Sequence, residues 1–187
     1  MTDHSFYELD SSTIIHRGAI YQYRPIFWLE PPLWILRNEQ WTLPRSASIY
    51  PQNELRDAFR RNIEDNQENV IARAKIRFVV VMSNDYECAK RQFGEVVVVP
   101  AYTLDPVTHS TEFLDKTRNN RVPSMFYLPS DPSFPQVAES YLDFRKVQTL
   151  DKGFLQEGKL GLSLTRWVTT AAIEQYRRYL TLEPKLS

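Results

Sequence analysis

The sequence has a single cysteine, few glycines and no excess of charge of either sign. Cys88 has no partner for an internal disulfide, and one cysteine cannot build a cysteine-based zinc site. Lys and Arg together number 23 and are balanced by 23 Asp and Glu, so no global field attracts a polyanion. Any polyanionic partner would therefore have to bind a local basic patch.

Long hydrophobic runs are also missing. No apolar stretch approaches the roughly 18 residues that cross a bilayer, and residues 1–10 carry acidic and polar side chains without the apolar region of a secretion signal. A lone cysteine is typical of a reducing compartment. We therefore expect a cytoplasmic protein with no membrane partner.

The composition is that of a folded domain. Hydrophobic residues make up 42% and charged residues 25% of the 187 residues, which is close to the globular average. This length fits one domain, 1–187, better than two. Five glycines beside 12 prolines and abundant aromatic residues predict stiff loops and bulky packing groups, but they do not select a function.

Short strands dominate the pattern along the chain. The runs at 76–82 and 95–102 are continuous and rich in β-branched residues, so we expect central strands covered on both faces. Residues 28–49 contain paired prolines and predict irregular loops or short edge strands. Further strands are predicted at 17–23, 124–128, 140–148 and 159–164, with polar, turn-like chain at 103–121 and a helical turn at 151–155.

Two amphipathic helices are expected. One covers 53–69 after Asn53, and the other covers 166–180 after Thr165, which is positioned to cap it. Several short strands followed by one amphipathic helix predict a small, mainly β barrel with a helix packed beside it.

Four segments give the chain a family resemblance. RGAIY, IRFVVVMSND, EVVVVPAYT and YLDFRKVQTLDKGFL occur in the order and spacing of PemK/MazF toxins. The chain resembles this family over about 15–25 and 75–182. The resemblance implies an SH3-like small barrel (PemK/MazF/CcdB-like) with a C-terminal helix, and it makes the helical segment at about 29–74 an insertion into the domain.

The same resemblance implies an activity and its partners. PemK/MazF toxins are metal-independent endoribonucleases that cut single-stranded RNA by attack of the ribose 2′-OH on the adjacent phosphate, leaving 2′,3′-cyclic phosphate and 5′-OH ends. They act without cofactors, usually as homodimers, and a cognate antitoxin inhibits them. We expect the same substrate, assembly and partner here.

Arg77 and Thr103 occupy the positions that carry catalysis in the family. Arg77 could bind phosphate oxygens with two parallel hydrogen bonds and stabilise the charge of the transition state. Thr103 ends a predicted central strand, where its hydroxyl could bind phosphate or relay a proton. The alternative is an ion-paired Arg at the start of a strand and a Thr that closes a turn.

Five further residues are candidates for substrate contacts. Ser83, Asn84 and Gln148 carry polar groups that could bind exposed base edges or sugars. Tyr23 and Trp28 lie on or just after the first family strand, where aromatic faces could stack bases at about 1–3 kcal/mol each. For Trp28, base stacking and core packing are equally good interpretations.

Alternative hypotheses remain open because the chain departs from the family pattern. Ala19 stands where an Asp is usual and Phe78 where a Pro is usual. The barrel could therefore be catalytically inactive and act as a protein- or nucleic-acid-binding module. A third hypothesis, a gyrase-poisoning relative, lacks the expected Trp-Gly-Ile ending. No motif of a metal hydrolase, NTPase, serine hydrolase or dinucleotide-binding protein is present.

Overall fold

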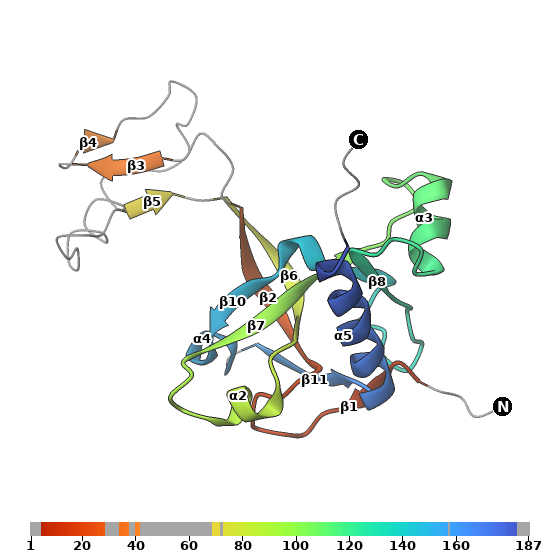
Figure 1. The fold of residues 1–187 in the computed structure, drawn as a ribbon, viewed down its shortest axis with the longest axis horizontal. Helices are drawn as coiled ribbons and strands as arrows, with labels where there is room; N and C mark the ends of the chain where they lie inside the picture. The colour runs from red at the N-terminus through yellow and green to blue at the C-terminus, as the bar shows by residue number, and fades with distance from the viewer. Residues whose placement is uncertain are drawn as a thin grey trace. The chain divides into compact units, whose positions relative to one another are not determined.

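The computed structural model describes residues 5–28, 34–37, 40–41, 69–71, 73–156 and 158–182 (Figure 1). The chain divides into two compact units, the first made of Met1–Ile26 and Ile76–Ser187 and the second of Phe27–Lys75. The assignment of one domain, 1–187, with an insertion at about 29–74 stays a prediction.

The first unit is built on one curled antiparallel sheet, so the expected mainly β class is confirmed. Its strand order is β1-β11-β2-β6-β7-β9-β8, and β10 pairs separately with β7. These strands are β1 (Tyr7–Leu9), β2 (Ala19–Trp28), β6 (Arg73–Val81), β7 (Glu95–Thr103), β8 (Met125–Leu128), β9 (Ser140–Asp143), β10 (Gln148–Asp151) and β11 (Lys159–Leu164).

Strand β7 gives the sheet its curl. One of its edges pairs with β6, while the other pairs with β10 over residues 95–98 and with β9 over residues 101–103. Two strands that share one edge of β7 must diverge, so the sheet bends into a half-barrel around it (Figure 1). The first half of β7 is therefore paired with β10, and its last residues are paired with β9.

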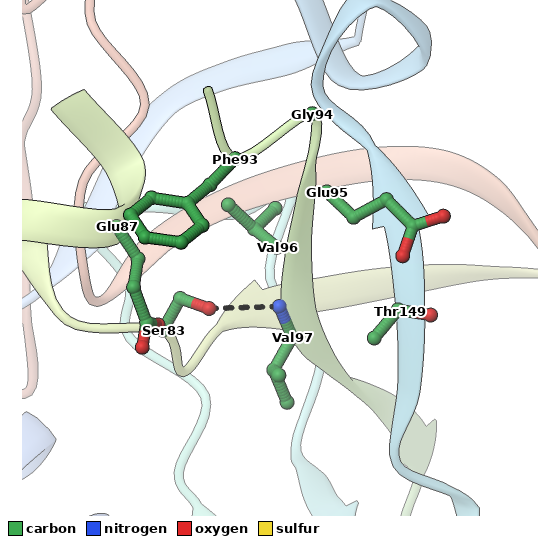
Figure 2. A pocket seen from close by; sticks show the side chains of 8 residues that line it. All are labelled: Ser83, Glu87, Phe93, Gly94, Glu95, Val96, Val97 and Thr149. Atoms are coloured by element: carbon green, nitrogen blue, oxygen red, sulfur yellow. Dashed lines mark hydrogen bonds between the residues drawn. The ribbon is translucent and has the colours of Figure 1, made fainter. Parts of the chain in front are cut away.

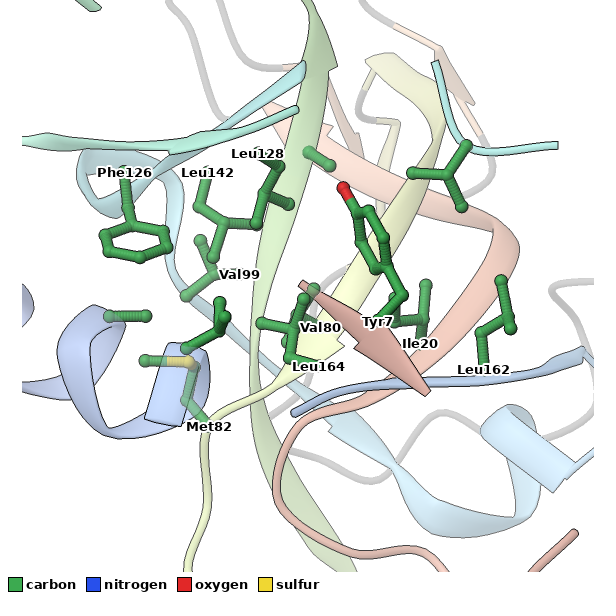
Figure 3. Close-up of a cluster of buried hydrophobic side chains, with 14 of the residues drawn as sticks. Tyr7, Ile20, Val80, Met82, Val99, Phe126, Leu128, Leu142, Leu162 and Leu164 are labelled. Carbon is green, nitrogen blue, oxygen red and sulfur yellow. The ribbon is translucent and has the colours of Figure 1, made fainter. Parts of the chain in front are cut away.

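Both faces of the central strands are buried, as the continuous apolar runs predict. Val80 and Val99 belong to one hydrophobic cluster, shown in Figure 3, and Val79 and Val98 belong to another. Side chains alternate between the faces of a strand, so each cluster takes every second residue. This confirms that β6 and β7 are covered on both sides.

Within the described residues, the helical segments are α2 (Asp85–Ala89), α3 (Thr111–Arg118), the 3-10 turn η1 (Phe144–Lys146), α4 (Lys152–Gln156) and α5 (Arg166–Leu180). Helix α5 has the predicted bounds, and its Val168 and Ala172 are fully buried in the cluster of Figure 3. Thr165 precedes α5 but, contrary to the prediction, makes no side-chain cap bond; its hydroxyl donates to the carbonyls of Ser5 and Phe6.

Two element predictions were wrong in part. The turn-like segment 103–121 contains helix α3, and the single strand at 140–148 is two strands separated by η1. Most of the helix predicted at 53–69 lies outside the described residues, and its last residue, Asn69, begins a strand.

The described part of the second unit is a three-stranded sheet in the order β4-β3-β5. Its strands are β3 (Trp34–Arg37), β4 (Gln40–Trp41) and β5 (Asn69–Ile71), so the short strands expected within 28–49 are confirmed where that region is described. Among the described residues, no helix is long and apolar enough to cross a membrane.

Candidate functional site

Arg77 lies on β6 beside an aromatic ring of β7. The register pairs Phe78 with Ala101, so the next pair sets Arg77 opposite Tyr102, and its guanidinium carbon lies 5.2 Å from the Tyr102 ring centroid. Nη1 donates to the carbonyl of Ile76 at 2.9 Å. Nε is buried without a hydrogen-bond partner. The side chain is half-buried and makes no ion pair within the described chain.

Arg77 begins a row of side chains that crosses four strands on one face of the sheet. Tyr102 on β7 is paired with Tyr141 on β9, and Tyr141 is paired with Tyr127 on β8. The rings of Tyr102 and Tyr141 stack with centroids 5.7 Å apart and planes 21° apart. Cross-strand partners point to the same face, so these four residues form a continuous row.

Asp143 and Arg145 lie beside this row at the end of β9. Arg145 donates from Nε and Nη2 to the two carboxylate oxygens of Asp143, each at 2.8 Å, and its backbone N–H donates to the same group at 3.1 Å. The Asp143 side chain is 5% exposed, whereas that of Arg145 is 50% exposed. The Asp143 carboxylate is thus shielded from solvent, while the Arg145 side chain is half exposed to it. Its hydrogen bonds to Asp143 raise the pKa of Arg145.

The charges of Arg77, Asp143 and Arg145 all act on the Tyr102 hydroxyl. Burial raises the pKa of Tyr102, and the carboxylate of Asp143 raises it further, while the charges of Arg77 and Arg145 lower it. The same three charged groups act on Tyr141. The Tyr102 hydroxyl is buried without a hydrogen-bond partner. Arg77, Tyr102, Asp143 and Arg145 therefore form one electrostatic site.

Thr103 is close to Arg77 along the sheet but faces the other way. It ends β7, is exposed, and is paired with Ser140. Arg77 shares a face with Tyr102, and side chains of adjacent strand residues point to opposite faces. Regular alternation therefore directs the Thr103 hydroxyl away from the guanidinium of Arg77. The structure brings the two residues to neighbouring strands but not to one face.

Ser83 and Asn84 lie well away from Arg77. Six residues of extended chain, roughly 20 Å, separate Arg77 from Ser83. The Ser83 hydroxyl accepts from the backbone N–H of Val97 at 2.9 Å. Asn84 caps α2, with its side-chain oxygen accepting from the N–H of Glu87 at 2.9 Å. Both side chains thus hold local structure.

A shallow open hollow of about 440 Å³ lies at this far end of β6 (Figure 2). Glu87 and Glu95 contribute carboxylates to its wall, and none of its lining side chains is basic. A phosphate would be repelled there, so the hollow does not suit an RNA backbone. Its lining residues are Ser83, Glu87, Phe93, Gly94, Glu95, Val96, Val97 and Thr149.

The other three predicted contact residues do not join the row. Gln148 begins β10 and is paired with Val98, near the middle of β7 and four residues from Tyr102, so it lies outside the row. Tyr23 and Trp28 are part of strand β2, but the structure does not describe their side chains.

Sequence reasoning missed Tyr102, Tyr141, Asp143 and Arg145. Tyr102 stands next to Thr103 inside one family segment, and the other three lie within YLDFRK of another. An Asp two residues before an Arg is a weak signal of an ion pair. Only the strand register shows that Tyr102 and Tyr141 share a face with Arg77. Asp143 follows Tyr141 by two residues on β9, and Arg145 is held on Asp143.

Comparisons with known proteins add no assignment: no protein-family model and no curated protein matches the chain. Within the described residues, no group of three or more His, Cys, Asp or Glu side chains could hold a metal ion. The structure therefore establishes the fold class, a mainly β protein whose curled sheet carries a row of one basic and three aromatic side chains, Arg77, Tyr102, Tyr141 and Tyr127.

Proposed function

We propose that this protein is a PemK/MazF-like endoribonuclease that binds single-stranded RNA at the Arg77 face and cuts it without a metal. The observation that carries the proposal is the state of Arg77, a half-buried guanidinium packed on the Tyr102 ring without a carboxylate partner in the described chain. A guanidinium that no acid neutralises is ready to bind a phosphate.

The order of strands supports the PemK/MazF-like, SH3-like character of the barrel. The family segments lie on β2, β6, β7 and β9–β10, and β2, β6 and β7 are consecutive neighbours in the sheet. β9 and β10 both pair with β7. The residues that carry the resemblance thus belong to one connected surface rather than to scattered parts of the chain.

In this proposal Arg77 stabilises the charge that develops on the scissile phosphate as the ribose 2′-OH attacks. Removing one such donor from an enzyme costs about 10²–10³ in kcat. Thr103 ends the neighbouring strand with its hydroxyl on the opposite face from Arg77, so the Thr103→Ala variant decides whether it takes part in the reaction. The products are a 2′,3′-cyclic phosphate and a 5′-OH.

A second candidate is the same barrel without cleavage, acting as an RNA-binding module. Strand alternation favours it, because the Thr103 hydroxyl points away from the guanidinium with which it would share a phosphate. The departures at Ala19 and Phe78 point the same way.

The proposal includes the assembly and partner of the family: a homodimer in the cytoplasm, inhibited by a cognate antitoxin whose tail covers the RNA-binding face. The antitoxin tail would then cover Arg77 and Tyr102, because the half-buried charge and ring of these two residues form the proposed RNA-binding face.

To test the proposal, the purified wild-type protein and the variants Arg77→Ala, Arg77→Lys and Thr103→Ala are each incubated with a long single-stranded RNA in EDTA. Cleavage with cyclic phosphate ends that falls at least 100-fold in Arg77→Ala, and nearly as far in Arg77→Lys, supports the enzyme. RNA binding without cleavage supports the module. Cleavage lost in Arg77→Ala and retained in Thr103→Ala would remove Thr103 from the mechanism.

A further inference from the structure

We propose that Arg145, oriented by Asp143, is a second phosphate-binding group, so that single-stranded RNA is held across β7 by two guanidinium groups, those of Arg77 and Arg145. This inference rests on the proposed RNA-binding function and extends it to a residue that the family resemblance does not assign.

The first argument is position. Arg145 follows β9 and is held on Asp143, which shares a face with Tyr141 because the two are two residues apart on one strand. Tyr141 is paired with Tyr102, on which Arg77 is packed. The charges of Arg77 and Arg145 both lower the pKa of Tyr102, so both lie within electrostatic reach of one hydroxyl.

The second argument is preorganisation. Asp143 binds the Nε and Nη2 of Arg145, which fixes the plane of the guanidinium and leaves its Nη1 edge outside the pair. The carboxylate is 5% exposed and the guanidinium side chain 50% exposed, so a ligand arriving from solvent meets the cation first. Fixing the side chain in advance removes part of the entropy cost of binding.

The chain contains a matched control for this arrangement. Arg118 also donates from Nε and Nη2 to a carboxylate, that of Glu139, each at 2.8 Å. Its charge acts on Tyr127, at the other end of the row, and is not among the charges that act on Tyr102. Arg118 is thus an equivalent ion pair without the proposed role.

The experiment measures binding of a 2′-O-methyl RNA oligonucleotide, which cannot be cut by 2′-OH attack, as a function of salt concentration. We expect Arg145→Ala to bind about tenfold more weakly, as for the removal of a hydrogen bond to a charged group. The slope of log K against log salt should fall by about 0.7, the value for one phosphate contact on a single strand. Arg118→Ala should leave affinity and slope unchanged.

Arg145→Ala also leaves the Asp143 carboxylate buried without its cation, which could disturb the fold. The double variant Asp143→Asn/Arg145→Gln removes both charges, keeps the net charge of the protein and retains hydrogen-bonding groups. The same loss of affinity and slope in this variant supports the inference. Loss in Arg145→Ala alone, or an equal loss in Arg118→Ala, overturns it.

The outcomes separate this inference from the proposed function. RNA cleavage by the wild type with unchanged binding by both Arg145 variants overturns the second phosphate contact and leaves the enzyme standing. Oligonucleotide binding that depends on Arg145, together with no cleavage of ordinary RNA, supports the contact and overturns the enzyme. Absence of oligonucleotide binding by the wild type overturns both.

Discussion

At the scale of single residues, the Tyr102 hydroxyl is one of four buried side-chain atoms of the described residues that have no hydrogen-bond partner. It is buried and unpartnered, and a buried polar group without a hydrogen bond costs free energy on folding. The Tyr102 ring, by contrast, stacks on Tyr141 and carries the guanidinium of Arg77. The hydroxyl and the ring can therefore be tested separately.

We predict that Tyr102→Phe leaves the free energy of unfolding unchanged or raises it by up to about 1 kcal/mol, because only an unsatisfied group is removed. Tyr127→Phe is the matched control: its hydroxyl donates to Glu139 at 2.7 Å, so its loss should cost about 1 kcal/mol. Urea unfolding of both variants provides the measurement. A loss in Tyr102→Phe as large as in Tyr127→Phe would mean that the hydroxyl has a partner.

Gly18 is a position where backbone conformation and space both require glycine. Its φ is +86°, and an added Cβ would lie 2.7 Å from Oγ1 of Thr169 on α5 and 3.3 Å from the carbonyl oxygen of Leu164. Its N–H donates to the carbonyl of Val81 and its own carbonyl accepts from Leu164, so the chain cannot easily shift. Gly18 thus links β6, β11 and α5.

We predict that Gly18→Ala lowers the free energy of unfolding by about 2–4 kcal/mol, through backbone strain and overpacking together. Gly161→Ala is the control, because Gly161 also has a positive φ, +73°, but open space where the Cβ would lie. It should cost only the strain, about 1–2 kcal/mol. Equal losses in denaturant unfolding would show that the contact with Thr169 does not matter.

At the scale of elements, an ion cluster fixes the segment that leads into β2. Asp10 accepts from Nε2 of His16 and pairs with Nζ of Lys159, each at 2.8 Å, and its side chain is 5% exposed. Burial alone would raise the pKa of Asp10, but hydrogen bonds from Lys159, from His16 and from the backbone of Ser12 lower it, and the net shift is downward.

The direction of this shift gives a pH prediction. A carboxylate with a lowered pKa in the folded state adds stability above its unfolded pKa of about 3.9, and this stability is lost as pH falls through the folded pKa. Asp10→Asn should therefore lower the free energy of unfolding by roughly 1–3 kcal/mol at pH 7, and the gap to wild type should close below about pH 4. Urea unfolding at several pH values measures it, and a gap that persists at low pH contradicts the assignment.

The elements also show what could be predicted from sequence. Helix α5 and strand β7 were predicted within one residue, because their apolar patterns are long and regular. Helix α3 was missed because it is only eight residues long and Leu114 is its only buried large apolar side chain, so the apolar pattern is too short to stand out from the polar segment around it. Its local signals were the Ser110 cap and the ion pair between Glu112 and Lys116.

The candidate site was harder to predict than the elements. Arg77 came from a motif, but its neighbours depend on strand register, and a shift of one residue exchanges the two faces of a strand. Asp143 illustrates the difficulty: it accepts from the N–H of Arg145 and begins η1, so the apparent strand at 140–148 ends where the ion pair forms. Pairing of β9 and β10 with different ends of β7 follows from that break.

At the scale of the whole molecule, the first unit has hydrophobic clusters of its own. The described members of three such clusters lie within residues 6–26 and 78–179. Strands β2 and β6, which lead into and out of the second unit, are neighbours in the sheet. The first unit therefore has an extensive core of its own, and its chain could be closed between the neighbouring strands β2 and β6.

We predict that replacing residues 28–74 with a six-residue Gly/Ser linker leaves a protein that unfolds cooperatively. Strands β2 and β6 are neighbours in the sheet, so a six-residue linker can join them at a modest entropy cost of closure. Binding of the 2′-O-methyl oligonucleotide should persist in the shortened protein, because Arg77, Tyr102 and Arg145 all belong to the first unit. Urea unfolding and the binding titration test the two parts. A shortened protein that folds but no longer binds would mean that residues 28–74 contribute part of the RNA site, and one that fails to fold would mean that the first unit depends on them.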